Sequence, residues 1–129
     1  MTPTPLERAL VEAAQLFRER RFYEVHEVLE DVWRTLTGER RVLVQGLIQI
    51  AVGFHHLRRG KPKSAVALFA RGRAKLVAHD AAACGVDVAA LLTDLGPWEA
   101  AAAAGEAWDE SRALPRFVLR VSDAGRFDV

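Results

Sequence analysis

The sequence predicts an all-α fold, a compact antiparallel bundle of four to five helices with an extended C-terminal arm. Apolar residues recur at spacings of three and four through residues 6–95, which is the period of a helix face packed on a core. Glycine and proline separate these segments at short intervals, so consecutive helices should be antiparallel or sharply crossed neighbours.

The first helix is predicted to begin at Pro5, with Thr4 as its N-cap, and to carry an apolar stripe from Leu6 to Phe17. A basic run follows at its end: Arg18, Arg20 and Arg21. Cations complement the exposed carbonyls of a helix end, so we interpret this run as part of the helix terminus rather than as a binding patch.

The second predicted helix, residues 22–36, carries polar side chains along the border of its apolar face. Its apolar residues gather on one side: Phe22, Val25, Leu29, Trp33 and Leu36. His26, Glu30 and then Glu27 lead from this stripe towards the polar face, so acid and imidazole should lie where core meets water. Thr37-Gly38 is predicted to end the helix, because glycine suits the left-handed position after a helix.

The third predicted helix, residues 40–59, is apolar over most of its circumference and should occupy the middle of the fold. One narrow polar strip interrupts it: Gln45, Gln49 and His56. Gly46 and Gly53 share one side, where each costs about 1 kcal/mol relative to alanine. Close approach of another backbone would compensate for this cost, and we expect a neighbouring helix, such as the second one, to pack there.

The fourth predicted helix spans residues 62–83, after Gly60-Lys61-Pro62 has ended the third. The basic residues at this turn have no aromatic residues among them for base stacking, which favours a solvated corner over phosphate binding. Further on, Asp87 is predicted to cap a short helix over residues 88–95 that ends at Gly96-Pro97.

The remaining chain is predicted to form a weak alanine-rich helix over residues 98–110 and then an extended arm, or a single strand, over residues 114–121. We therefore divide the chain into a helical domain, residues 1–95, and a C-terminal extension, residues 96–129. The extension is expected to pack on the same domain or on a neighbouring subunit, with its tryptophans as anchors.

Length, charge and cysteine content limit the class of protein to which the chain can belong. With 129 residues, half of them hydrophobic, the chain suits one globular domain. A net charge of +1 gives no electrostatic footprint for nucleic acid or for an anionic membrane, so neither partner is expected. The single cysteine, Cys84, fits a reducing compartment, and the N-terminus lacks the apolar segment of a signal peptide. We expect a soluble cytoplasmic protein.

Imidazoles and carboxylates from the second and third helices form a candidate metal site. His26 and Glu30 are four residues apart and lie about 6 Å apart at their Cβ atoms. With His56 they make a set that suits Zn²⁺, Fe²⁺ or Mn²⁺ better than Ca²⁺. Gln45 and Gln49 would then orient the ligands or a bound water. The motif His26-Glu27-x-x-Glu30 resembles the zinc-peptidase helix His-Glu-x-x-His, with a carboxylate in place of the second histidine.

Without a metal, Glu27 and Glu30 are candidates for general acid and base, because crowding and burial would raise one carboxyl pKa and leave the other group ionised. The candidate ligand-binding residues are Tyr23, His26, Gln45, Gln49 and His56. The candidate structural residues are Trp33, Gly46, Gly53 and Gly60. His55 is expected to point away from His56 and to lie outside the cluster.

The alternative is a polar network that only fixes helix register. In that case His26 would bond to Glu30, Gln49 to a main-chain carbonyl or to His56, and Glu27 to Arg34 or to solvent.

The segments Phe22 to Arg34, Gln45 to Gln49 and His56 to Gly60 together resemble the family known as domain of unknown function 309. The resemblance covers about residues 6–95, and it implies a small all-helical domain and no established activity. The family's motif residues correspond here to eight positions: His26, Glu27, Glu30, Trp33, Gln45, Gly46, Gln49 and His56.

Two functional hypotheses follow. In the first, a His/Glu/Gln pocket between the second and third helices binds a metal ion or a small polar ligand and has a hydrolytic activity. In the second, the chain is a non-catalytic module that self-associates or binds a protein through Trp98, Trp108 and the arm around Phe117, forming a homo-oligomer through its C-terminal segment.

Overall fold

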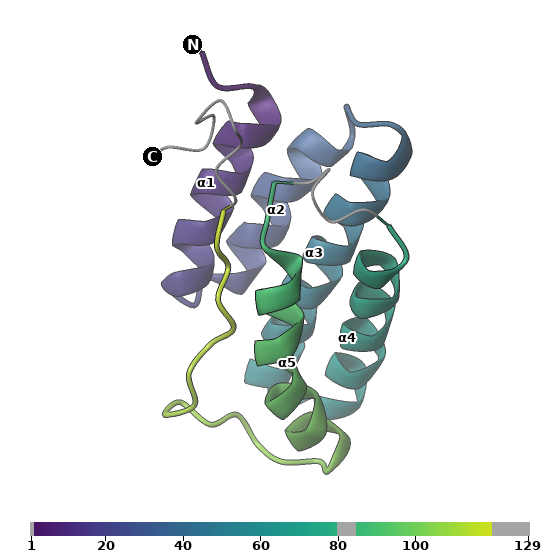
Figure 1. Cartoon of the computed structure of the whole chain (residues 1–129). Helices are drawn as coiled ribbons and strands as arrows, with labels where there is room; N and C mark the ends of the chain where they lie inside the picture. The colour runs from purple at the N-terminus through teal and green to yellow at the C-terminus, as the bar shows by residue number, and fades with distance from the viewer. Residues whose placement is uncertain (1, 80–84, 120–129) are drawn as a thin grey trace.

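The computed structural model describes residues 2–79 and 85–119, and within them the chain forms five helices and no extended sheet (Figure 1). The helices are α1 (Pro5–Arg18), α2 (Phe22–Trp33), α3 (Gly38–Arg58), α4 (Pro62–Val77) and α5 (Val88–Ala103). Each helix packs on the next one along the chain. The predicted all-α bundle is therefore confirmed. The fourth helix ends at Val77, earlier than predicted, and residues 80–83 of its predicted range lie outside the described residues, as does Cys84.

The core of the bundle is built around Phe54 of α3. Its ring lies 5.5 Å from that of Phe17, 5.3 Å from Phe22, 5.0 Å from Phe69 and 5.2 Å from Trp98, measured between centroids. These four rings come from α1, α2, α4 and α5, so one side chain of the central helix contacts all the others. Such aromatic contacts add to the hydrophobic burial that holds the helices together.

The start of α1 was predicted correctly. Thr4 is the N-cap: its hydroxyl accepts the backbone N–H of Glu7 at 3.1 Å, and the Glu7 carboxylate accepts the N–H of Thr4 at 3.1 Å. This reciprocal pair satisfies two of the donors that a helix start leaves free. Asp87 caps α5 in a similar way, accepting the N–H of Ala90 at 3.1 Å.

The predicted end of the second helix is wrong, because α2 stops at Trp33 and Gly38 begins α3 instead. The reason is a set of side chains that bind the last carbonyls of α2. Arg41 donates to the carbonyls of Trp33 and Leu36 at 3.3 and 3.1 Å, and Thr35 donates to that of Val32 at 2.7 Å. The helix end is therefore satisfied by these bonds, and Gly38 adopts the predicted left-handed conformation, at φ 66°, at the start of α3 instead.

The glycines of α3 face α4, not α2. A Cβ at Gly53 would lie 2.6 Å from ring atoms of Phe69, and one at Gly46 would lie 3.1 Å from the carbonyl oxygen of Gly72. The close helix approach that the glycines predicted is confirmed, and the suggestion that the second helix makes it is wrong. This contact joins α3 and α4 into a tightly packed pair.

The predicted break at Gly96-Pro97 is also wrong, because α5 continues to Ala103 with Pro97 inside it. Proline removes one helix hydrogen bond and clashes with the preceding turn, so something must hold the two halves together. Arg73 of α4 does so, since its Nη2 donates to the Leu92 carbonyl at 2.7 Å and to Glu99 at 2.6 Å. Trp98, with 1% of its surface exposed, anchors the later half in the core.

The segment after α5 is an extended arm that returns along the bundle to α1 (Figure 1). The predicted helix over residues 98–110 is wrong beyond Ala103, because Gly105 adopts φ 73° and ends it. Phe117 is buried and its ring lies 5.6 Å from that of Phe17. The last described residue of the arm, Leu119, forms an isolated antiparallel bridge with Val86.

The arm packs on its own domain, so three apolar side chains that were candidates for a partner surface are used within the chain: Trp98, Trp108 and Phe117. Homo-oligomer formation and the division at residue 95 stay predictions. Among the described residues, no helix is both long and apolar enough to cross a membrane.

Candidate functional site

The candidate site is a hollow of about 280 Å³ on the outer face of α2. Its lining comes from side chains spaced at three, four and seven residues, which places them on one face of the helix. They are Tyr23, His26, Glu27, Glu30, Asp31 and Arg34. Three carboxylates face one guanidinium there, so the hollow is acidic. Tyr23, His26, Glu27 and Glu30 lie together here, but all come from α2, whereas the pocket was predicted between the second and third helices; their predicted roles stay predictions.

Three of these side chains form a continuous chain of hydrogen bonds. His26 Nε2 lies 2.5 Å from one carboxylate oxygen of Glu30, and Arg34 Nη2 donates to the other at 2.8 Å. The hydrogen bond from His26, followed by the Arg34 contacts, lowers the pKa of the Glu30 carboxyl below its usual value. Both oxygens of Glu30 are occupied, so this carboxylate is placed to anchor His26 rather than to transfer protons to a ligand.

The imidazole of His26 is held in one orientation by this bond. Because its Nε2 is the nitrogen that faces Glu30, its Nδ1 is left buried, and within the described residues Nδ1 has no hydrogen-bond partner. A proton on Nε2 makes Nδ1 an acceptor, and an unpaired acceptor is easier to bury than an unpaired donor. The bond between His26 and Glu30 is the one that the alternative network predicted, and of the two alternatives given there for Glu27, Arg34 or solvent, the second is found, because Arg34 pairs with Glu30.

A row of rings links this hollow to α3. The Tyr23 ring lies 5.4 Å from His26 on one side and 5.4 Å from His55 on the other, and His55 lies 5.8 Å from His56. The expectation that His55 lies outside the cluster is therefore wrong. Burial, followed by the nearby charge of His56, lowers the pKa of His55.

The sequence contained a signal for His55 that was not used. At about 100° per residue, His55 lies about 200° around the helix from Gly53. Since the Gly53 side packs on α4, His55 must face the opposite way, towards α2. The sequence interpretation placed Gly46 and Gly53 against the second helix, and for that reason it did not predict that His55 faces α2.

The two glutamines of the polar strip do not line the hollow. Gln49 accepts a hydrogen bond from Lys75 of α4 at 2.9 Å, so this part of the strip faces α4. Gln45 lies one turn before Gln49 on the same side and is half-buried. Their predicted role in orienting ligands around His26 is not supported by this placement.

The predicted metal set of His26, Glu30 and His56 is not supported either. His56 does not line the hollow, and its Nδ1 is buried without a hydrogen-bond partner in the described structure. Across residues 2–79 and 85–119, no group of three or more His, Cys, Asp or Glu side chains is arranged to hold a metal ion. His26 and Glu30 bond to each other instead.

The four predicted structural residues have clear places in the fold. Trp33 donates from Nε1 to the Arg41 carbonyl at 3.0 Å, and the Arg41 guanidinium lies 3.8 Å from the centroid of its ring. Gly46 and Gly53 allow the approach of α4, and Gly60 adopts φ 78° at the end of α3. These residues fix how α2, α3 and α4 pack on one another.

Comparison with known proteins supports the resemblance found in the motifs. No curated protein matched the chain. A family model does match residues 10–68, a range that includes α2, α3 and therefore the whole hollow, although it is narrower than the predicted range. Residues 10–68 of the chain are thus similar to the family described as "Domain of unknown function (DUF309)".

Proposed function

We propose that the chain binds a small polar ligand with a positive charge in the hollow on α2. The observation that carries the proposal is the distribution of partners among the three carboxylates. Glu30 is engaged by His26 and Arg34, whereas the exposed Glu27 makes no hydrogen bond or ion pair within the described structure. Asp31 has only a long contact of 3.7 Å with Arg34. Two carboxylates are thus available to a ligand.

An ammonium group suits the rest of the lining. Tyr23 lines the hollow and is 49% exposed, and contacts between an aromatic ring and a cation add to charge-assisted hydrogen bonds. The volume of about 280 Å³ lies near the lower end for ligand sites, so the ligand is small. The bonded pair of His26 and Glu30 would keep the floor of the hollow fixed.

The role proposed is recognition rather than hydrolysis. Hydrolysis needs a group that moves protons beside the ligand, and Glu30, the predicted acid or base, is already held on both oxygens. A metal could supply a nucleophilic water, but the predicted ligands do not converge.

The proposal is tested with a matched pair of probes, benzylamine and benzyl alcohol, which differ in charge and share the ring. Nuclear magnetic resonance titration should give shifts around Tyr23 with benzylamine and much weaker ones with the alcohol. Glu27→Gln removes the charge and keeps the shape, and should weaken benzylamine binding about threefold to tenfold. Glu12→Gln, an exposed carboxylate on α1, is the control and should change nothing.

The competing hypothesis is that the polar cluster only fixes helix packing. It predicts no shift around Tyr23 with either probe, and no difference between Glu27→Gln and the wild type. Replacing Glu30 would then lower the melting temperature and have no other effect. Either equal binding of both probes or insensitivity to Glu27→Gln would overturn the proposal.

A further inference from the structure

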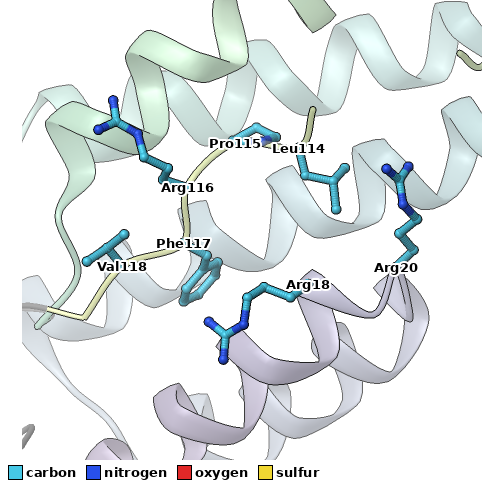
Figure 2. Close-up of a pocket in the computed structure, with 7 residues that line it drawn as sticks. All are labelled: Arg18, Arg20, Leu114, Pro115, Arg116, Phe117 and Val118. Atoms are coloured by element: carbon cyan, nitrogen blue, oxygen red, sulfur yellow. The ribbon is translucent and has the colours of Figure 1, made fainter. Parts of the chain in front are cut away.

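A second hollow, of about 380 Å³, lies between the end of α1 and the C-terminal arm (Figure 2). Its apolar wall consists of Leu114, Pro115, Phe117 and Val118. Its basic wall consists of Arg18, Arg20 and Arg116. In Figure 2 the guanidinium of Arg18 lies beside Phe117 and that of Arg20 rises beside Leu114, while that of Arg116 points away. Arginine and apolar side chains are thus combined in one place.

The backbone at Arg20 is unusual for a side chain of this size. In the part of the chain that the structure describes, three helices end in the same motif, in which the N–H groups of two successive residues bond back to the last turn. At α3 and α5 the left-handed position is occupied by Gly60 and Gly105, at φ 78° and 73°. At α1 it is occupied by Arg20, at φ 62°, the only described residue other than glycine with positive φ. This costs free energy that glycine would avoid, and such strain is often retained for a function of the side chain.

The guanidinium of Arg20 has an unused donor. Its Nη1 is buried and has no hydrogen-bond partner among the described residues. Its nearest acid is Glu110, whose Oε1 lies 3.7 Å from Nε; the Glu110 side chain is 65% exposed, and its other oxygen accepts from Trp108. A buried unpaired donor on a cation is costly, and the exposed Glu110 at 3.7 Å offsets little of the charge, so the Arg20 guanidinium keeps the capacity to bind an anion.

The other two arginines of the hollow differ in how far they are engaged. Arg116 is committed to Asp94, to which its Nε donates at 2.8 Å. Arg18 is exposed, and within residues 2–79 and 85–119 it bonds only to Gln15, a neutral partner, at 2.9 Å. Arg18 and Arg20 therefore carry the charge that a ligand could neutralise.

The apolar wall is fixed in place. The backbone N–H of Arg116 donates to Asp94 at 3.0 Å, and the Val118 carbonyl accepts the N–H of Asp87 at 2.8 Å. Phe117 between them is 5% exposed. A wall held on both sides of Phe117 needs little ordering when a ligand binds, which favours affinity.

We propose that this hollow binds a small organic carboxylate with an apolar body. Arg20 and Arg18 would bind the carboxylate, because guanidinium groups match its geometry and do not lose their charge. Leu114 and Phe117 would contact the apolar body. The site is independent of the hollow on α2, shares no lining residue with it and has the opposite charge.

The test uses the full chain with hexanoate, 1-hexanol and inorganic phosphate as probes, measured by titration calorimetry or nuclear magnetic resonance. Hexanoate should bind more tightly than either other probe. Arg20→Gly removes the guanidinium while giving the helix end its preferred residue, and should weaken hexanoate binding about tenfold. Arg20→Asn, which also tolerates the left-handed conformation, is a second variant if the first folds poorly.

Arg71→Gln, on the exposed side of α4, is the control and should leave hexanoate binding unchanged. Three results would overturn the proposal: hexanoate binding that does not depend on Arg20, 1-hexanol binding as tightly as hexanoate, or phosphate binding as tightly as hexanoate. The last would show a general anion site without a role for the apolar wall.

Discussion

The central helix α3 meets its two neighbours in different ways. Towards α4 it presents Gly46 and Gly53, and the backbones approach so closely that an added Cβ would overlap Gly72 or Phe69. Towards the outer part of α2 it presents His55, which contacts the ring of Tyr23 at the edge of a polar hollow. The first contact is closed and fixes the fold. The second leaves polar groups exposed where a ligand can reach them, so the same helix serves both structure and recognition.

The strongest test of the closed side is Gly72→Ala. A Cβ there would lie 2.8 Å from the Gly46 carbonyl oxygen and 2.7 Å from a side-chain carbon of Ile50. Overpacking against backbone should outweigh the helix propensity of alanine and lower the free energy of unfolding by about 2 kcal/mol. Urea denaturation measures this. Gly53→Ala, which meets the ring of Phe69 instead, should cost less, and an unchanged stability of Gly72→Ala would show that α3 and α4 can separate easily.

The next test concerns the turn that joins α2 to α3 and so sets the position of the hollow. Arg41→Ala removes two hydrogen bonds to the end of α2 and the stacking of a guanidinium on Trp33. Arg41 is half-buried, and we expect a loss of about 1–2 kcal/mol in the free energy of unfolding. Arg40→Ala changes an exposed neighbour and should have little effect in the same thermal or urea unfolding measurement. Equal stability of the two variants would rule out this role for Arg41.

The fold was predictable where local chemistry decides it. The caps at Thr4 and Asp87 act within three residues, so their side-chain types were enough to locate two helix starts. The end of α2 and the passage of α5 through Pro97 were not predictable in this way. Arg41 acts from the next helix and Arg73 from α4, and a sequence pattern does not show which distant side chain will reach a carbonyl.

In the candidate site, too, contacts within one helix were predictable and contacts between helices were not. His26 and Glu30 share one helix, so their contact could be predicted from a spacing of four. The positions of Gln49 and His55 depend on how α3 is rotated between α2 and α4, which periodicity alone does not determine. Gln49 therefore meets Lys75, away from the hollow, and His55 joins the ring of Tyr23 instead.

A smaller effect should distinguish the residues that follow α3 and α1, Gly60 and Arg20. Gly60→Ala places a Cβ at φ 78°, where it meets nothing within 4 Å, so the change reports backbone strain alone. It should lower the free energy of unfolding by about 1 kcal/mol. At Arg20 the comparison is between two variants: Arg20→Gly should be about 1 kcal/mol more stable than Arg20→Ala, since both lack the guanidinium and only alanine retains the strain. Thermal denaturation measures the loss in Gly60→Ala and the difference between the two Arg20 variants. Equal stability of Arg20→Gly and Arg20→Ala would show that the backbone at this position is not strained.

The smallest expected effect is the pH dependence that His55 adds on the open side of α3. Burial lowers its pKa in the folded state, and nearby cationic groups at His56, Arg59 and Lys61 act in the same direction. The unfolded chain then binds a proton at His55 more readily than the folded chain does. The contribution of neutral His55 to the free energy of unfolding is therefore complete above about pH 6.5, and it is lost as the pH falls below that value through the folded-state pKa.

His55→Gln should therefore reduce the fall in melting temperature between pH 7.5 and pH 5.5. His79→Gln is the control, because this histidine lies beyond α4 beside Glu39 and its removal should leave the contribution of His55 intact. If His55→Gln shows the same fall in melting temperature as the wild type, the fold does not lower the pKa of His55. The open side of α3 would then be less enclosed around Tyr23 than the ring contacts indicate.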